Sequence, residues 1–120
     1  MTLLFSDEHT WLQRDGSTAV MGITLHAQET LGDIVFVDLP AVGQSFSAKE
    51  VAGVVESVKA AADVHMPAGG EIIEVNEALR ADPSLANSDP LGQGWFFKVR
   101  LTQLADLDVL MDEATYQKSL

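Results

Sequence analysis

The chain of 120 residues contains no cysteine. Disulfides, thiolate metal sites and CxxC redox pairs are therefore excluded as sources of stability or chemistry. If the protein handles redox-active sulfur, a cofactor must supply that sulfur. The sequence also has no apolar run near the roughly 20 residues that a membrane-spanning helix needs, and its first residues lack the pattern of a secretory or transit peptide. We therefore expect a cytoplasmic protein with no membrane contact.

Positive charge is scarce as well. Seven Lys and Arg residues stand against 18 Asp and Glu, which gives a formal net charge of -11. Such a surface repels nucleic acid and anionic membranes, keeps a small protein monomeric, and suits brief encounters with basic patches on larger partners. The three histidines, His9, His26 and His65, are too scattered to show a metal-binding spacing. We expect a monomer with no nucleic-acid partner and no metal site.

What is present is an ordinary globular composition, with 47% hydrophobic and 21% charged residues. No linker or low-complexity tract divides the chain, so residues 1–120 are expected to form a single domain. Short strand patterns dominate, and Gly and Pro residues punctuate them. Residues 33–39 are nearly continuously apolar, as expected for a strand covered on both faces, whereas Trp95, Phe97, Val99 and Leu101 alternate inward. The predicted strands are residues 18–24, 33–39, 51–58, 71–76 and 95–101.

Helical patterns are few and short. Thr24 is predicted to cap a helix that Gly32 ends, and another turn is predicted near residues 76–79. At the C-terminus Leu107, Leu110, Met111 and Ala114 form one apolar stripe at helical spacing, and Asp112 is predicted to cap a final segment stapled by Met111 and Tyr116. Residues 83–94 are predicted to be a loop. The pattern indicates a small antiparallel sandwich or flattened barrel with peripheral helices.

One lysine interrupts an apolar region. Residues 53–67, GVVESVKAAADVHMP, place Lys59 between two strand-like segments, where a tight hairpin would project its side chain into water. On the pattern alone, an ordinary solvated turn lysine is the default interpretation.

The surrounding sequence changes that interpretation, because ESVKAAAD resembles the lipoylation motif of glycine cleavage H proteins. Upstream, GITLHAQETLGDIVFVDLPAVGQ (residues 22–44) is similar to a signature of that family. Downstream, the similarity includes Pro67, residues 70–71 and 74–77, Asn87, residues 89–90, Gly92, residues 94–95, Met111 and Tyr116. The resemblance covers nearly the whole chain, from Glu8 to Tyr116.

The resemblance implies a mainly β, lipoyl-domain-like fold. This is a barrel-sandwich hybrid of two antiparallel sheets with short peripheral helices, one of them C-terminal. It also implies a carrier and not an enzyme. A lipoate ligase or lipoyl transferase would attach lipoate to Lys59. The arm would then carry the aminomethyl group of glycine from the pyridoxal-phosphate-dependent glycine decarboxylase (P protein) to the tetrahydrofolate-dependent aminomethyltransferase (T protein). The dihydrolipoyl dehydrogenase (L protein) would reoxidise it.

Further site residues follow from the same resemblance. Two groups are implied beside Lys59: one that the ligase reads and one that surrounds the arm. The first group comprises Glu56, Ser57, Val58 and Ala60, and the second comprises Asp63, Glu8, His9 and Thr10. Trp11 is interpreted as core packing.

Two positions depart from the family pattern. Thr10 stands where His-Glu-Trp is common, and Ala62 stands where Ser usually precedes the aspartate. Glu8 is a candidate replacement for the missing carboxylate, because residues two apart on an extended strand share a face. The Thr10 departure keeps a second function open, a lipoyl relay or storage protein that supplies 2-oxoacid dehydrogenases. A biotinyl carrier is disfavoured because Lys59 lacks flanking methionines, and an enzyme because no nucleophile–base constellation is present.

Overall fold

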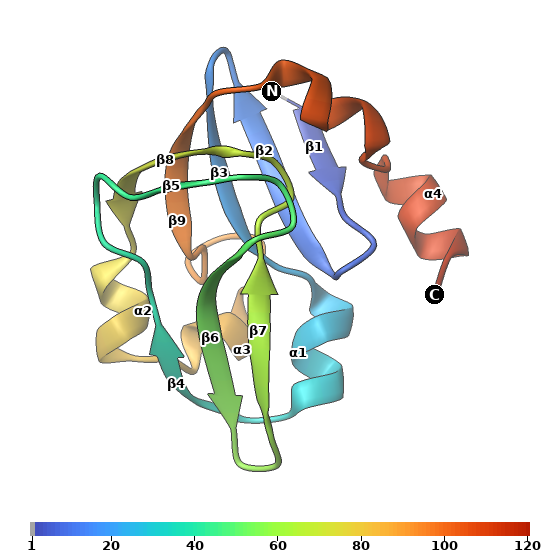
Figure 1. Ribbon diagram of the computed structural model, residues 1–120. Helices are drawn as coiled ribbons and strands as arrows, with labels where there is room; N and C mark the ends of the chain where they lie inside the picture. Colours follow the sequence, from blue (N-terminus) through green and yellow to red (C-terminus); the bar gives the residue numbers. More distant parts are fainter. Residues whose placement is uncertain (1) are drawn as a thin grey trace.

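The computed structural model describes residues 2–120 and is mainly β, with two antiparallel sheets (Figure 1). The six-stranded sheet has the order β1-β2-β3-β9-β8-β5, and the three-stranded sheet has the order β4-β6-β7. This confirms the expected fold class. The strands are β1 Thr2–Phe5, β2 Thr10–Asp15, β3 Thr18–Ile23, β4 Ile34–Asp38, β5 Ser45–Phe46, β6 Val51–Ser57, β7 Ala61–His65, β8 Gly70–Val75 and β9 Phe97–Leu101.

Short helices surround the sheets. The Thr24 hydroxyl accepts a hydrogen bond from the Ala27 N–H at 3.2 Å, and Gly32 ends that helix with a φ of 80°, so both predicted caps are confirmed. Asp112 caps the last helix as predicted, accepting from the Thr115 N–H at 2.8 Å. Among residues 2–120 no helix is long and apolar enough to cross a membrane. The helices are α1 Leu25–Leu31, α2 Glu77–Ala81, α3 Leu85–Ser88, the 3-10 helix η1 Leu104–Val109 and α4 Glu113–Lys118.

The main core joins the inner faces of both sheets. Phe97, Val99 and Leu101 are buried there as their alternation predicted, together with residues of β2, β4, β6 and β7. Trp95 was expected to join them but is half-buried and packs instead against a second cluster, while Phe96 takes the buried place. That second cluster contains Phe5, Trp11 and Tyr116. The expectation that Trp11 packs in a core is confirmed.

Strand β4 corrects the expectation of a strand covered on both faces. Ile34 and Val37 are buried, but Val35 is 54% exposed and Phe36 is 49% exposed. The register with β6 shifts between Ile34 and Phe36, so a bulge lies at this point. A bulge places two residues opposite one, which turns two neighbouring side chains outward where strict alternation would turn out only one.

The C-terminal stripe does not form one helix. Leu107 lies in η1, whereas the Met111 backbone exchanges two 2.8 Å hydrogen bonds with Phe5 on β1 before α4 begins. The Asp112 cap is extended, so a helix cannot run through it. The predicted loop at residues 83–94 likewise contains α3, because the Ser84 carbonyl accepts from the Asn87 and Ser88 N–H groups and closes a helical turn.

Candidate functional site

Lys59 lies at the tip of the hairpin that joins β6 to β7. The Ser57 N–H donates to the Ala60 carbonyl at 2.8 Å, and the Ser57 hydroxyl oxygen accepts from the N–H groups of Lys59 and Ala60, each at 3.1 Å. The Val58 N–H donates to the Asp33 carbonyl at 3.1 Å, which ties the tip to the start of β4. One serine therefore holds the turn that presents the lysine.

The Lys59 side chain is exposed and leans across Gly32. A Cβ atom at Gly32 would lie 3.2 Å from Lys59 Cε and 3.6 Å from Nζ. None of the ion pairs within residues 2–120 involves Lys59. Glycine serves two purposes here, since it adopts the left-handed φ that ends α1 and leaves room for the lysine.

The Asn87 side chain is hydrogen bonded to the segment between α1 and β4, which contains Gly32, the residue that the Lys59 side chain contacts. Its amide nitrogen donates to Gln28 Oε1 at 2.9 Å and to the Gly32 carbonyl at 2.8 Å, while its amide oxygen accepts from the Ile34 N–H at 2.8 Å. The end of α1 and the start of β4 are thus joined to α3 through one side chain.

A cavity of about 220 Å³ lies between α1, the hairpin and the start of β2. Four of the residues predicted to surround the arm, Glu8, His9, Thr10 and Asp63, line it together. Leu31, which immediately precedes Gly32, also lines the cavity, and Gly32 is the residue against which the Lys59 stem lies. The remaining apolar lining comes from Ile23, Ala27, Val55 and Ala62.

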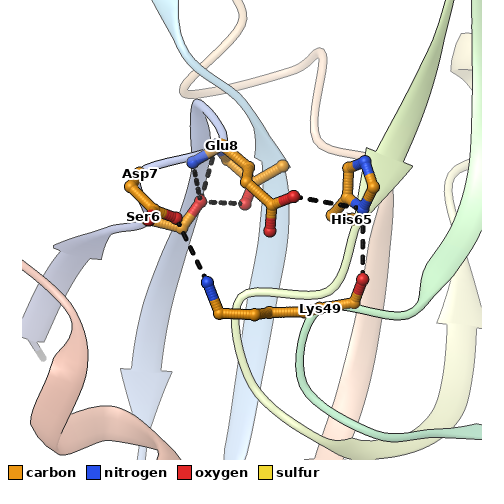
Figure 2. A network of polar contacts seen from close by, with 6 residues as sticks. Ser6, Asp7, Glu8, Lys49 and His65 are labelled. Atoms are coloured by element: carbon orange, nitrogen blue, oxygen red, sulfur yellow. Dashed lines mark hydrogen bonds and ion pairs between the residues drawn. The ribbon is translucent and has the colours of Figure 1, made fainter.

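Thr10 and Glu8 occupy different surroundings in this cavity. Thr10 is buried, and its hydroxyl is hydrogen bonded to the Ser6 hydroxyl at 2.7 Å. Glu8 lies in the turn between β1 and β2 and not on an extended strand, which corrects the geometry assumed from sequence. Figure 2 shows its carboxylate directed at His65, with 3.3 Å between Oε2 and Nδ1, beside the Lys49–Asp7 pair at 3.5 Å.

His9 is held in an unusual conformation at the cavity wall. Its φ is 63°, a left-handed value that is uncommon outside glycine. Its Nδ1 is hydrogen bonded to the Tyr116 hydroxyl at 2.8 Å, and the same hydroxyl is 2.8 Å from the Thr24 hydroxyl. Burial, and then the neighbouring His26 ring at 4.6 Å, lower the pKa of His9. His9 is therefore mainly neutral at neutral pH.

The structure separates the residues implied for ligase recognition from the cavity. Glu56 is exposed on the face opposite Val55, which follows from the alternation along β6, and Ser57, Val58 and Ala60 belong to the hairpin tip. Sequence reasoning did not place His26 or Tyr116 in the site. No local pattern could link Tyr116 to His9, because the two residues are 107 positions apart.

Comparison with known proteins agrees with this geometry. The family model described as glycine cleavage H-protein matches residues 3–120. The chain belongs to the glycine cleavage H-protein family. It is 58% identical over 120 residues to the glycine cleavage system H protein of Chromobacterium violaceum, covering 98% of this chain and 93% of the relative. It also matches the crystal structure of a glycine cleavage system H protein from Mycobacterium marinum, with a TM-score of 0.88 and 38% identity over 98% and 97% of the two chains.

Membership gives the general role of the chain. Glycine cleavage H-proteins are lipoyl carriers and not catalysts, and this chain works with the other components of the glycine cleavage system. The resemblance read from the ESVKAAAD motif and its flanking segments is thereby confirmed at the level of the family.

Proposed function

We propose that lipoate is attached as an amide to Lys59 Nζ. On this arm the chain would carry the aminomethyl group of glycine from the pyridoxal-phosphate-dependent decarboxylase to the tetrahydrofolate-dependent aminomethyltransferase, and then return to the dihydrolipoyl dehydrogenase. The lipoyl disulfide would supply the redox-active sulfur that a chain without cysteine lacks.

The observation that carries this proposal is the exposure of Lys59 at a rigidly bonded tip. Its ammonium has no carboxylate partner among residues 2–120, so nothing in the fold has to be broken before a ligase takes it. Amide formation removes one positive charge from a chain whose net charge is already -11. Gly32 leaves space where any other side chain would crowd the lysine stem.

The cavity supports a sheltering role for the residues around it. Glu8 and Asp63 are two acidic residues of its lining, and His9 contributes a mainly neutral imidazole that does not repel a cation. A charge-assisted hydrogen bond between an amine and such a carboxylate is worth about 1.5–3 kcal/mol. The apolar wall of Leu31, Val55 and Ala62 would keep water away from the cargo.

The test is to lipoylate the purified chain and locate the added mass by peptide mass spectrometry. The modification is expected on Lys59 alone, and Lys59→Arg should stay folded but unmodified and inactive as a carrier, since a guanidinium does not form the lipoyl amide. Modification of Lys49, Lys98 or Lys118 in place of Lys59 would contradict the proposal.

A lipoyl relay is the second candidate, and the Thr10 environment favours keeping it. The Thr10 hydroxyl is already bonded to Ser6, so it cannot serve cargo in the way a free carboxylate would. Both functions share the modified Lys59 but differ in the next step. Glycine-dependent release of carbon dioxide in the presence of the decarboxylase supports glycine cleavage. Transfer of lipoate to a 2-oxoacid dehydrogenase, with no glycine-dependent release of carbon dioxide, supports the relay.

The remaining expectations belong to the same proposal. Residues 1–120 would act as one carrier domain, since one core cluster draws on segments from Leu12 to Leu101. The carrier would be monomeric, as its high negative charge favours, and would work in the cytoplasm. Sedimentation of the purified chain and fractionation of the source cells test these two points.

A further inference from the structure

The outward side of the three-stranded sheet is an exposed, partly apolar surface close to Lys59. Directly opposed residues form two rows across it: Phe36, Glu56 and Ala61 in one, and Asp38, Val54 and Asp63 in the other. The β4 bulge adds Val35. We name this surface the outer face; it consists of Val35, Phe36, Asp38, Val54, Glu56 and Ala61. Asp63 lies at its edge on β7, where it also lines the cavity.

The bulge determines what this face presents. In a regular strand, Ile34 and Phe36 would point to one side and Val35 and Val37 to the other. Here Ile34 and Val37 are buried, and two neighbouring apolar side chains are about half exposed, Val35 at 54% and Phe36 at 49%. Aromatic side chains, phenylalanine among them, are enriched at the cores of protein interfaces, so an exposed Phe36 on a sheet is suited to anchor a partner. In Figure 1 this sheet stands in front of α3, with α1 and α2 to its sides.

The charge of the region is one-sided. Asp33, Asp38 and Glu56 are exposed around the apolar side chains, and within residues 33–38 and 51–63 the only Lys or Arg is Lys59 itself. A partner that covers this surface therefore needs an apolar pocket with a basic rim.

The length of the unmodified Lys59 side chain indicates which partner covers this surface. A lysine side chain extends only about 6 Å from its Cα, five bonds of about 1.5 Å laid in zigzag. An enzyme that acts on the unmodified Lys59 Nζ must therefore touch the protein immediately around the tip. The outer face begins there, because the Val58 N–H is bonded to Asp33, next to the start of β4. Enzymes that act on the far end of a lipoyl arm can stand further away.

We propose that the outer face is the docking surface for the enzyme that attaches lipoate to Lys59, with Phe36 and Val35 as its apolar anchor and Asp38 and Glu56 as its electrostatic guide. This rests on Lys59 being the attachment site, and it assigns to the β4 bulge a role in choosing the partner.

The experiment uses the unmodified chain as substrate for a purified lipoate–protein ligase with lipoate and Mg·ATP, followed by intact-protein mass. Val35→Ser combined with Phe36→Ser is expected to raise the KM for the chain about tenfold or more with kcat little changed, as expected for loss of an interface anchor. A chain that carries Phe36→Leu in place of the two serine substitutions should bind the ligase with a KM close to the native value. Val42→Ser and Leu104→Ser, at apolar positions 61% and 50% exposed elsewhere, are the matched controls and should leave KM within about twofold.

The contribution of Asp38 and Glu56 can be measured separately, through the dependence of KM on ionic strength. Asp38→Asn combined with Glu56→Gln should raise KM at low salt and flatten its dependence on ionic strength, because fewer charges steer the encounter. Far-ultraviolet circular dichroism should match the native chain for each variant, since these exposed side chains take part in none of the ion pairs among residues 2–120.

The outcomes separate the two proposals. An unchanged KM for the Val35/Phe36 variant, with the mass still added to Lys59, overturns the docking surface and leaves the carrier function standing. Mass added at another lysine removes the carrier proposal itself. A native chain that sediments as a dimer, and becomes monomeric in the Val35/Phe36 variant, shows that a second copy covers the face and overturns ligase docking.

Discussion

Glu8 and Thr10 line the same cavity, but their polar side-chain groups have different hydrogen-bonding partners. Thr10 is 2% exposed and its hydroxyl is paired with Ser6, whereas Glu8 is half-buried and its partner His65 is a base that carries charge only when protonated. An amine entering the cavity would therefore have one partner to displace at Glu8, whereas the Thr10 hydroxyl is already paired in the interior. We infer that Glu8 supplies the carboxylate that position 10 lacks.

Glu8→Gln is expected to speed spontaneous ammonia release from the aminomethyl-loaded carrier. Loss of one charge-assisted hydrogen bond of about 1.5–3 kcal/mol corresponds to roughly 10- to 100-fold in the exposure of the cargo to water. The measurement is ammonia release over time, with the exposed Asp15→Asn as the control. If Glu8→Gln releases ammonia at the native rate while Asp63→Asn accelerates it, Asp63 holds the cargo; if Thr10→Glu alone slows release, the carboxylate at position 10 is truly missing.

His9 makes the stability of the protein dependent on pH. Its pKa is lowered in the folded state, mainly by burial and then by His26, so between the folded and unfolded pKa the unfolded chain binds more protons. Stability contributed by neutral His9 is complete above the ordinary pKa of about 6.5 and falls as the pH decreases below it. The urea concentration at the unfolding midpoint should therefore fall less in His9→Gln than in the native chain as the pH is lowered from about 7.5 to 5.5. Parallel curves for the two proteins would show that His9 is not the responsible group.

Among the secondary-structure elements, the helix caps could be predicted because they depend on local hydrogen bonds. Features that depend on contacts between distant segments could not. Thr24, Gly32 and Asp112 are caps whose partners lie within four residues, so sequence alone located them. The exposure of Phe36 could not be predicted, because it depends on a bulge that only the pairing of β4 with β6 creates. Met111 fitted a helical stripe, but its pairing with Phe5 is decided by a strand more than 100 residues earlier.

The connection between α1 and β4 depends on Asn87. Asn87→Ala removes three hydrogen bonds and leaves the N–H of the buried Ile34 without a partner. The expected loss of unfolding free energy is about 1–3 kcal/mol, measured by urea denaturation. Because Gly32 lies in this connection, the rate of Lys59 lipoylation should change as well. Ser88→Ala, an exposed substitution on the same helix, serves as the control and should change neither value.

For the whole molecule, folding and modification should be independent. The hairpin turn is bonded through Ser57, Ala60 and Asp33, and none of these hydrogen bonds uses the Lys59 side chain. A contribution of 1 kcal/mol shifts the melting midpoint of a domain this size by several degrees. The midpoints of lipoylated and unmodified protein should therefore differ by less than about 2 °C in calorimetry. A larger gap would mean that the arm packs as part of the core.

The hydrogen bond from His9 to Tyr116 also sets an order of events during synthesis. The two residues are separated by 107 positions, and the Phe5–Met111 pairing spans nearly as far. Because a ribosome releases the N-terminal part of a chain first, the hairpin with Lys59 emerges well before the residue that fixes the cavity wall. A nascent chain could thus display its attachment lysine while the chamber for the cargo is still open on one side. Formation of the His9–Tyr116 hydrogen bond would then complete the cavity wall after Lys59 is already accessible for modification.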